Sequence, residues 1–131
     1  MSENNKPCPC GGPSLEECCG RFLSKENSAE TAEQLMRSRY TAYVTGNEDY
    51  LKASWHPSTC PSDQLTDASI KWLALELRAA EEKGDEATVE FVARCRVSGR
   101  GHRLHETSRF VREAGQWFYL DGTFEKNDKG Q

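Results

Sequence analysis

The second half of this 131-residue chain alternates between apolar and polar side chains, which indicates strands with one buried face. Leu73, Leu75 and Leu77 alternate with small or charged residues, and residues 86–97 continue the pattern with Ala87, Val89, Phe91, Ala93, Cys95 and Val97. Two further strands are predicted at about 103–113 and 116–125. The glycine-containing breaks at 83–85, 99–101 and 114–115 are short enough for hairpins, so we predict an antiparallel four-strand meander.

Apolar residues at helical spacing precede these strands: Ala32, Leu35, Met36, Tyr40, Tyr43 and Val44. Thr31 is a suitable N-cap for this helix, and Gly46 and Asn47 are expected to end it. A second short helix is predicted at about 48–55, and the prolines of residues 56–66 indicate a loop. Helices followed by a meander predict an α+β fold, in which a curved antiparallel sheet packs on the first helix.

Size and hydropathy exclude several protein classes. The length suits one domain with a small appendage. No apolar run approaches 18 residues and the N-terminus is polar, so we expect neither a membrane span nor a secretory signal. The expected location is therefore the cytoplasm, where thiols are reduced.

Four of the six cysteines lie close together near the N-terminus: Cys8, Cys10, Cys18 and Cys19. Two close thiol pairs joined by a short turn suit the tetrahedral coordination of Zn²⁺. Disulfides are disfavoured by a reducing compartment and by the strain of a bond between neighbouring cysteines, and four unconnected thiols are the other alternative. We therefore predict one structural Zn²⁺ per chain, with no coordination position open to water.

Four groups of residues resemble known motifs or a known family. Cys8-Pro9-Cys10-Gly11 followed by Cys18-Cys19-Gly20 resembles the SEC-C motif, with seven residues between the pairs rather than the usual eight. The stretches 32–43, 55–59 and 108–113 resemble the YchJ family of bacterial SEC-C proteins. The resemblance implies a SEC-C-like zinc knuckle at 1–24 and a nuclear transport factor 2-like domain at 25–131. It implies no substrate, because no reaction is established for that family.

The third and fourth strands place polar groups on the face that also carries core residues. If Phe110 faces the core, alternation turns Glu106 and Ser108 the same way. Alternation likewise takes Asp121 inward with Trp117. Because burying two carboxylates is costly, a bulge changes the register, or the groups line a pocket or pair with Arg39. The candidate pocket residues are Arg39, Tyr43, His56, Glu106, Ser108, Tyr119 and Asp121.

These features favour a zinc-binding accessory protein. Its knuckle would contact a protein partner, and its larger domain would act as a scaffold or hold a small-molecule ligand. The similar knuckle of the preprotein translocase motor SecA implies, by analogy, an export- or ribosome-associated partner. An acid–base enzyme (isomerase, dehydratase or hydrolase) is the alternative, with His56, Glu106 and Asp121 as candidate catalytic residues. A purely structural cluster of polar groups is the third interpretation of these pocket residues. The sequence therefore does not decide whether the protein is an enzyme.

The net charge of −4 conceals an asymmetry. Residues 94–112 contain six arginines and one acid, a local net charge of +5, so the remainder carries −9. An acidic chain repels polyanions, which argues against general nucleic-acid binding. The outer face of the sheet could still bind an acidic partner or nucleic acid through Arg94, Arg96, Arg103 and Arg109. Ordinary ion pairing is the simpler explanation for these arginines. Cys95 is expected in the core, and Cys60 has no assigned role.

Overall fold

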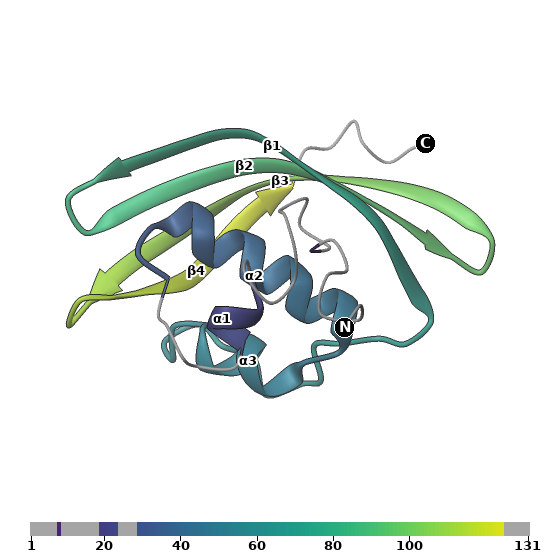
Figure 1. Ribbon diagram of the computed structural model, residues 1–131, viewed down its shortest axis with the longest axis horizontal. Coiled ribbons are helices and arrows are strands. Elements are labelled where there is room, and N and C mark those ends of the chain that lie inside the picture. The colour runs from purple at the N-terminus through teal and green to yellow at the C-terminus, as the bar shows by residue number, and fades with distance from the viewer. Residues whose placement is uncertain (1–7, 9–18, 24–28, 125–131) are drawn as a thin grey trace, which may run out of the picture.

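The computed structural model describes Cys8, residues 19–23 and residues 29–124 of the chain. These contain helices α1 (Gly20–Leu23), α2 (Ala32–Thr45) and α3 (Glu48–Ala53), then strands β1 (Ile70–Lys83), β2 (Glu86–Val97), β3 (Arg100–Glu113) and β4 (Gln116–Phe124). Figure 1 shows the sheet curving over the helices, which confirms the predicted α+β class. None of the described helices combines the length and the apolar character needed to cross a membrane.

Helix α2 begins and ends where its capping residues predict. Thr31 Oγ1 accepts a hydrogen bond from the Gln34 N–H at 3.1 Å, and Gly46 ends the helix with φ at 74°. The buried surface of α2 is wider than one stripe, because the helix contacts α1 and α3 as well as the sheet. Arg39 is therefore buried together with its apolar neighbours, whereas Val44, predicted to be apolar and inward, is 38% exposed.

The strands form one antiparallel sheet in the order β1-β2-β3-β4, as the meander predicts. The β2–β3 hairpin turns at Ser98 and Gly99, and the β3–β4 hairpin turns at Ala114 and Gly115. All four residues have positive φ, the combination that matches a tight turn to the twist of its strands. The β2–β3 turn lies one residue earlier than predicted, so β3 begins at Arg100.

Strand β1 departs from simple alternation. Its pairing with β2 shifts between Trp72 and Ala74, so Leu73 is an extra residue that reverses which side chains face inward. Trp72 packs against the core, whereas Leu73 is 46% exposed. The prediction that Leu73 shares a face with Leu75 is therefore wrong, although Leu75 does pack inward.

The core lies between α2 and the concave inner face of the sheet. Its buried cluster includes Leu35 and Met36 of α2, Phe91 of β2, Phe110 of β3 and Trp117 of β4.

Three residues from the N-terminal segment join this cluster: Cys8, Cys19 and Phe22. The described part of the predicted knuckle therefore packs directly on the larger domain. The boundary at residue 24 lies outside the described residues and stays a prediction.

Candidate functional site

A cavity of about 230 Å³ opens between α2 and the inner face of the sheet. Aromatic and aliphatic side chains form most of its wall, and a few polar groups form the rest. The lining residues are Met36, Arg39, Tyr40, Tyr43, Leu65, Asp67, Ile70, Trp72, Phe91, Ala93, Leu104, Glu106, Ser108, Phe110 and Tyr119. A mainly apolar cavity with a few convergent polar groups is the usual form of a small-molecule site.

Glu106 is the buried carboxyl group of this cavity, with 9% of its surface exposed. It sits opposite Phe91 in the β2–β3 ladder and so faces inward. Its Oε2 accepts hydrogen bonds from Ser108 Oγ at 2.8 Å and from Tyr119 Oη at 3.0 Å. No hydrogen bond to Oε1 is formed within the described part of the chain. One carboxyl oxygen therefore remains available to another donor.

The position of this carboxyl group depends on a glycine in the next strand. Gly122 lies opposite Ser108 in the β3–β4 ladder. A Cβ added at Gly122 would overlap Glu106 Oε2. The missing side chain thus creates the space that the carboxyl group occupies.

Burial raises the pKa of Glu106 above its ordinary value, because desolvation disfavours the charged form. The hydrogen bonds from Ser108 and Tyr119 and the charge of Arg39 act in the opposite direction. Burial also raises the pKa of Tyr119, as does the neighbouring Glu106. Tyr119 therefore stays a neutral hydrogen-bond donor near neutral pH.

Arg39 supplies the opposite charge, from helix α2. It is 6% exposed, and Nη1 donates to the Leu51 carbonyl at 2.8 Å and to Ser54 Oγ at 2.7 Å. Its guanidinium carbon lies 4.4 Å from the centre of the Tyr119 ring and 5.1 Å from that of Trp55. Burial lowers its pKa, but a guanidinium remains protonated at neutral pH.

Tyr43 and Trp72 form part of the aromatic wall. Their ring centres are 5.8 Å apart, and the ring centre of Tyr40 lies 5.9 Å from that of Trp72. Burial raises the pKa of Tyr43, so it too is a neutral phenol. Trp72 was not predicted to line the pocket, because the inward face of β1 was assigned to Leu73. Tyr40 was predicted only as part of the apolar stripe of α2. An aromatic residue at the start of β1 was the signal that could have found Trp72.

His56 lies outside the cavity. Its backbone N–H donates to the Tyr119 carbonyl at 2.8 Å, which fastens the segment after α3 to β4. Its ring nitrogens lie 2.8 Å from Ser58 Oγ and 2.9 Å from Glu113 Oε2. His56 therefore pairs with a carboxylate on the protein surface, not with Glu106.

Asp121 also lies outside the cavity, because β4 contains a bulge. The ladder shifts between Arg109 and Phe110, which makes Leu120 an extra residue and turns Asp121 to the outer face. There its two oxygens accept from Arg109 Nε and Nη2, both at 2.7 Å, which lowers the pKa of Asp121. The predicted catalytic candidates His56, Glu106 and Asp121 are thus not brought together.

Of the predicted zinc ligands, the structure describes Cys8 and Cys19, while Cys10 and Cys18 lie outside the described residues. Cys8 is 3% exposed, with its Sγ 3.6 Å from Thr41 Oγ1, and Cys19 is 1% exposed. Among the described residues alone, no three potential ligands cluster as a metal site. Cys95 is buried as predicted, and Cys60 is half-buried in its loop.

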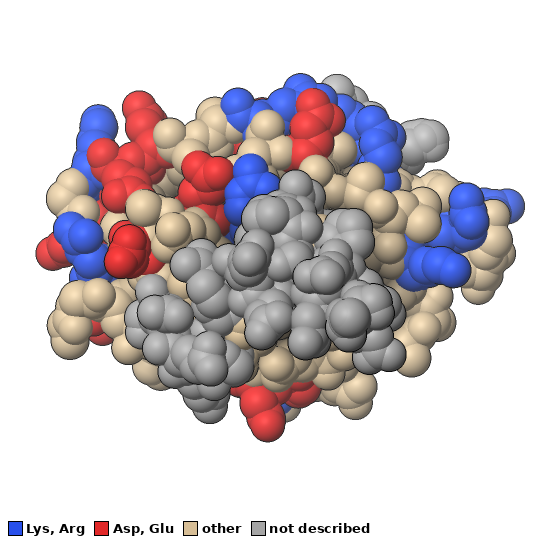
Figure 2. Space-filling model, viewed as in Figure 1, with Lys and Arg blue, Asp and Glu red and all other residues tan. Residues whose placement is uncertain are grey.

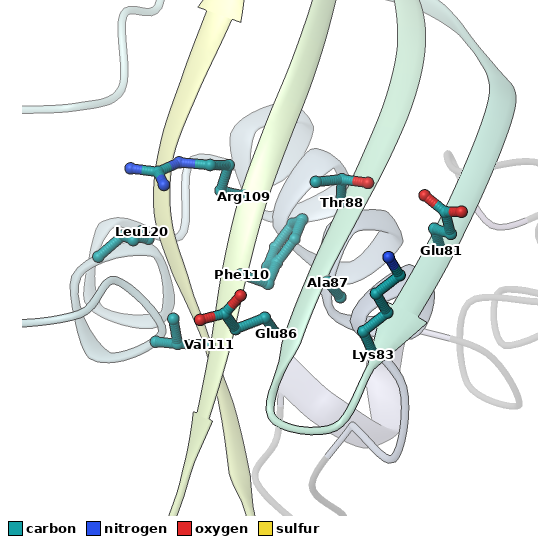
Figure 3. Close-up of a pocket in the computed structure, with 9 residues that line it drawn as sticks. All are labelled: Glu81, Lys83, Glu86, Ala87, Thr88, Arg109, Phe110, Val111 and Leu120. Atoms are coloured by element: carbon teal, nitrogen blue, oxygen red, sulfur yellow. The ribbon is translucent and has the colours of Figure 1, made fainter.

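A second hollow, of about 270 Å³, lies on the outer face of the sheet (Figure 3). Side chains from all four strands line it, including Glu81 and Lys83 of β1, Glu86 of β2 and Arg109 of β3. These charged groups are exposed to solvent, and Arg109 is already engaged by Asp121. The inner cavity is therefore the stronger candidate site.

Comparison with known proteins places this architecture among related chains. The family model of the YchJ middle NTF2-like domain matches residues 31–122. A UPF0225 protein of Chromobacterium violaceum is 53% identical over 122 residues, covering 88% of this chain and 90% of that protein. One from Cupriavidus metallidurans is 52% identical over 123 residues, covering 88% and 87%.

Solved structures of related proteins superpose on this fold. A SEC-C motif containing protein from Rhodopseudomonas palustris superposes with a TM-score of 0.82 at 34% identity, covering 92% of this chain and 99% of that one. One from Psychrobacter arcticus gives a TM-score of 0.76 at 26% identity, covering 96% and 86%. An LEH-like epoxide hydrolase of M. tuberculosis, at 10% identity and a TM-score of 0.53, covering 76% and 88%, shares the fold alone.

Proposed function

The chain belongs to the YchJ family of SEC-C motif proteins, and we propose that it is a zinc-carrying accessory protein whose larger domain binds a small molecule. The ligand is mainly apolar and donates a hydrogen bond to Glu106. The single observation that carries this proposal is the unused Oε1 of a buried carboxyl group that lines an apolar cavity. A buried polar atom without a partner is unfavourable, and a donor from a ligand would satisfy it.

The charges of the cavity favour a neutral ligand. Arg39 is a buried cation and Glu106 is a buried acid, so a cationic ligand would meet the charge of Arg39 and an anionic ligand would meet a second acidic group. The volume of about 230 Å³ is below the roughly 300–1,000 Å³ of drug-sized sites, so the ligand is small. The aromatic wall of Tyr40, Tyr43 and Trp72 suits a flat ring.

Indole and benzofuran provide a matched pair of probes. The two molecules have nearly the same shape, but only indole carries an N–H donor. We expect indole to bind about tenfold more tightly, because only it can satisfy Glu106. Titrations followed by NMR would measure both affinities and identify the cavity resonances that move.

Two variants test the role of the carboxyl group. Glu106→Gln retains the shape but removes the charge, and should weaken indole severalfold while leaving benzofuran unchanged. Asp121→Asn is the matched control on the outer face and should affect neither probe. Equal affinities for the two probes would rule out recognition of a donor, and no binding of either would rule out the cavity as a site for flat ligands.

The proposal assigns one structural Zn²⁺ to Cys8, Cys10, Cys18 and Cys19. Four thiols are a donor set that suits Zn²⁺, and the reducing cytoplasm that we propose as the location keeps them available. The burial of Cys8 and Cys19 in one cluster supports their participation. When bound, the ion would supply folding free energy to a segment too short to fold by core burial alone.

Native mass spectrometry tests the metal directly. We expect one Zn²⁺ per chain, lost in a Cys18→Ser/Cys19→Ser variant and retained in the control Cys60→Ser. A metal-free protein whose thermal unfolding responds neither to added Zn²⁺ nor to a chelator would contradict the assignment.

In this proposal the knuckle is also a contact platform for a protein partner. The analogy with SecA points to an export- or ribosome-associated partner.

A further inference from the structure

Two segments that take no part in the inner cavity meet at the surface of the protein. The turn after α3 contributes His56 and Ser58, and the last residue of β3 is Glu113. Ser58 Oγ lies 2.8 Å from His56 Nδ1, and His56 Nε2 lies 2.9 Å from Glu113 Oε2. A hydroxyl group, an imidazole and a carboxylate therefore follow one another at hydrogen-bond distance. This is the order in which a base activates a nucleophile and a third group orients the base.

The neighbours of the imidazole decide which of its nitrogens carries the proton. A carboxylate only accepts hydrogen bonds, so the contact with Glu113 requires the proton on Nε2. The backbone N–H of Ser58 donates to Nδ1 at 3.1 Å, so Nδ1 is an acceptor. The lone pair of Nδ1 is therefore directed toward Ser58 and can take the proton of its hydroxyl group.

Contacts with β4 hold the imidazole in place. The His56 N–H donates to the Tyr119 carbonyl at 2.8 Å, and the His56 ring meets that of Phe118 edge-on, with 5.8 Å between the ring centres. The His56 side chain is only 16% exposed, whereas Ser58 is an exposed residue. The base is thus fixed, while the hydroxyl group that it contacts remains accessible to a molecule in solution.

The N–H groups of the turn limit the chemistry that this site can support. Those of Thr59 and Cys60 donate to the His56 carbonyl at 3.1 and 3.0 Å, and that of Ser58 donates to Nδ1. None of these three groups is free to stabilise the oxygen anion that forms during attack on a carbonyl group. The site therefore suits an acyl donor with a good leaving group rather than an ordinary ester or an amide.

The surrounding surface does not select a charged donor. In Figure 2 the left end of the molecule, where the β3–β4 hairpin lies, shows Asp and Glu side chains beside Lys and Arg side chains. A surface of mixed sign gives little long-range attraction or repulsion for an ion. A small neutral donor can therefore approach Ser58 as readily as a charged one.

From this geometry we infer that Ser58 is a nucleophile that accepts an acyl group from a small activated ester or thioester. Its Oγ bonds to the carbonyl carbon while its proton passes to His56 Nδ1, and the charge of Glu113 stabilises the resulting imidazolium. The bond between the carbonyl carbon and the leaving group then breaks, and the leaving alkoxide or thiolate takes the proton from Nδ1. The products are O-acylated Ser58 and a free alcohol or thiol. Glu113 acts through His56, so it is a positioning residue.

Acetylation by p-nitrophenyl acetate tests the inference, because peptide mass spectrometry assigns the acetyl group to one residue. Ser69 is the internal control, since it is also exposed but its Oγ donates to the Asp67 carboxylate, at 2.7 Å, rather than to an imidazole. We expect Ser58 to be acetylated more than about tenfold faster than Ser69, because a positioned base assists the proton transfer. Equal rates at the two serines overturn the inference.

Two variants separate the base from general reactivity. His56→Gln removes the imidazole but keeps the backbone hydrogen bonds of the turn, and should slow acetylation of Ser58 by more than about tenfold. Ser58→Ala should abolish the adduct at this position, while both variants leave the rate at Ser69 unchanged. Amide NMR spectra check that each variant is folded. An unchanged rate at Ser58 in folded His56→Gln protein overturns the inference.

NMR of the imidazole nitrogens provides a test that needs no variant. We expect the neutral ring of His56 to carry its proton on Nε2, and a proton on Nδ1 instead would overturn the inference. Glu113→Gln keeps an acceptor for Nε2 but removes the charge, so the tautomer should stay the same while acetylation of Ser58 slows severalfold. An unchanged rate in this variant would show that Glu113 only supports the structure.

The outcome is separate from that of the proposed ligand cavity. Glu106→Gln changes the buried carboxyl group of the cavity and leaves the surface turn intact. It should therefore be acetylated at Ser58 like the unmodified protein. Failure of indole binding with retained acetylation would contradict the cavity alone, and the reverse result would contradict the nucleophile alone.

Discussion

The inner and outer faces of the sheet carry their charged residues in different ways. On the inner face Glu106 is buried, accepts hydrogen bonds from neutral hydroxyl groups, and has a pKa raised by desolvation. On the outer face Asp121 forms a two-bond pair with Arg109, which lowers its pKa. The two carboxyl groups lie on adjacent strands, so their different chemistry comes from desolvation and pairing rather than from residue type.

The arginines show the same contrast. Arg39 is buried against two aromatic rings and two hydrogen-bond acceptors, whereas the Arg109 side chain is 60% exposed. A buried charge depends on its partners more than an exposed charge does, so removing those partners lowers the free energy of unfolding by more. The inner face should therefore tolerate few changes, and the outer face should tolerate many.

Replacing each arginine by methionine should give the largest difference between the faces. Arg39→Met removes the hydrogen bonds to Leu51 and Ser54 and the charge that favours ionised Glu106, so we expect a loss of about 2–4 kcal/mol in the free energy of unfolding. Arg109→Met should cost much less, because an exposed ion pair contributes little to stability. Urea denaturation measures both, and equal losses would show that burial does not distinguish these arginines.

A pair of glycines offers the next comparison. Gly122→Ala forces a Cβ onto the Glu106 carboxyl group and should cost about 1–2 kcal/mol through overpacking. A Cβ at Gly101 meets nothing within 4 Å, so Gly101→Ala should be neutral or slightly stabilising. Thermal unfolding of both variants checks this, and a harmless Gly122→Ala would mean that the carboxyl group moves aside freely.

Much of the fold follows from local sequence signals. Thr31 and Gly46 define the ends of α2, and the glycine-containing breaks separate the four strands close to where the structure has them. The register shifts at Leu73 and Leu120, and a further one between Leu77 and Ala79, could not be read in the same way. A bulge is an adjustment between paired strands, and alternation within one strand contains no information on its partner's register.

The bulges also explain how the candidate site differs from its prediction. Arg39, Tyr43, Glu106, Ser108 and Tyr119 do line the inner cavity. Asp121 leaves it because Leu120 reverses the face of β4. His56 leaves it because its backbone pairs with Tyr119 while its ring turns to Glu113, a contact between residues far apart in sequence.

The two carboxyl groups should respond oppositely to pH. Glu106 binds its proton more tightly in the folded protein, so folding takes up protons and ionisation of Glu106 lowers stability as pH rises above its ordinary value of about 4.3. The stability of the unmodified protein relative to Glu106→Gln should therefore fall between pH 4 and pH 7. Asp121 holds its proton less tightly when folded, so its contribution is present above about pH 3.9 and is lost as pH falls below that value. Relative to Asp121→Asn, the stability of the unmodified protein should rise with pH across the acid range. Urea denaturation at several pH values measures both stability differences. Two differences that change with pH in the same direction would show that the two environments are alike.

The smallest expected effect tests the bulge in β1 and therefore the assignment of faces itself. Leu73 is 46% exposed on the outer side, so Leu73→Ser should change the free energy of unfolding by less than about 0.5 kcal/mol. Leu75 packs against the core two residues later, so Leu75→Ser should cost about 1–2 kcal/mol through lost apolar burial. Without the extra residue, alternation would place both leucines on one face and the two substitutions would cost the same. Equal losses in urea denaturation would thus contradict the bulge. Without the bulge, Trp72 would face outward and could not line the cavity.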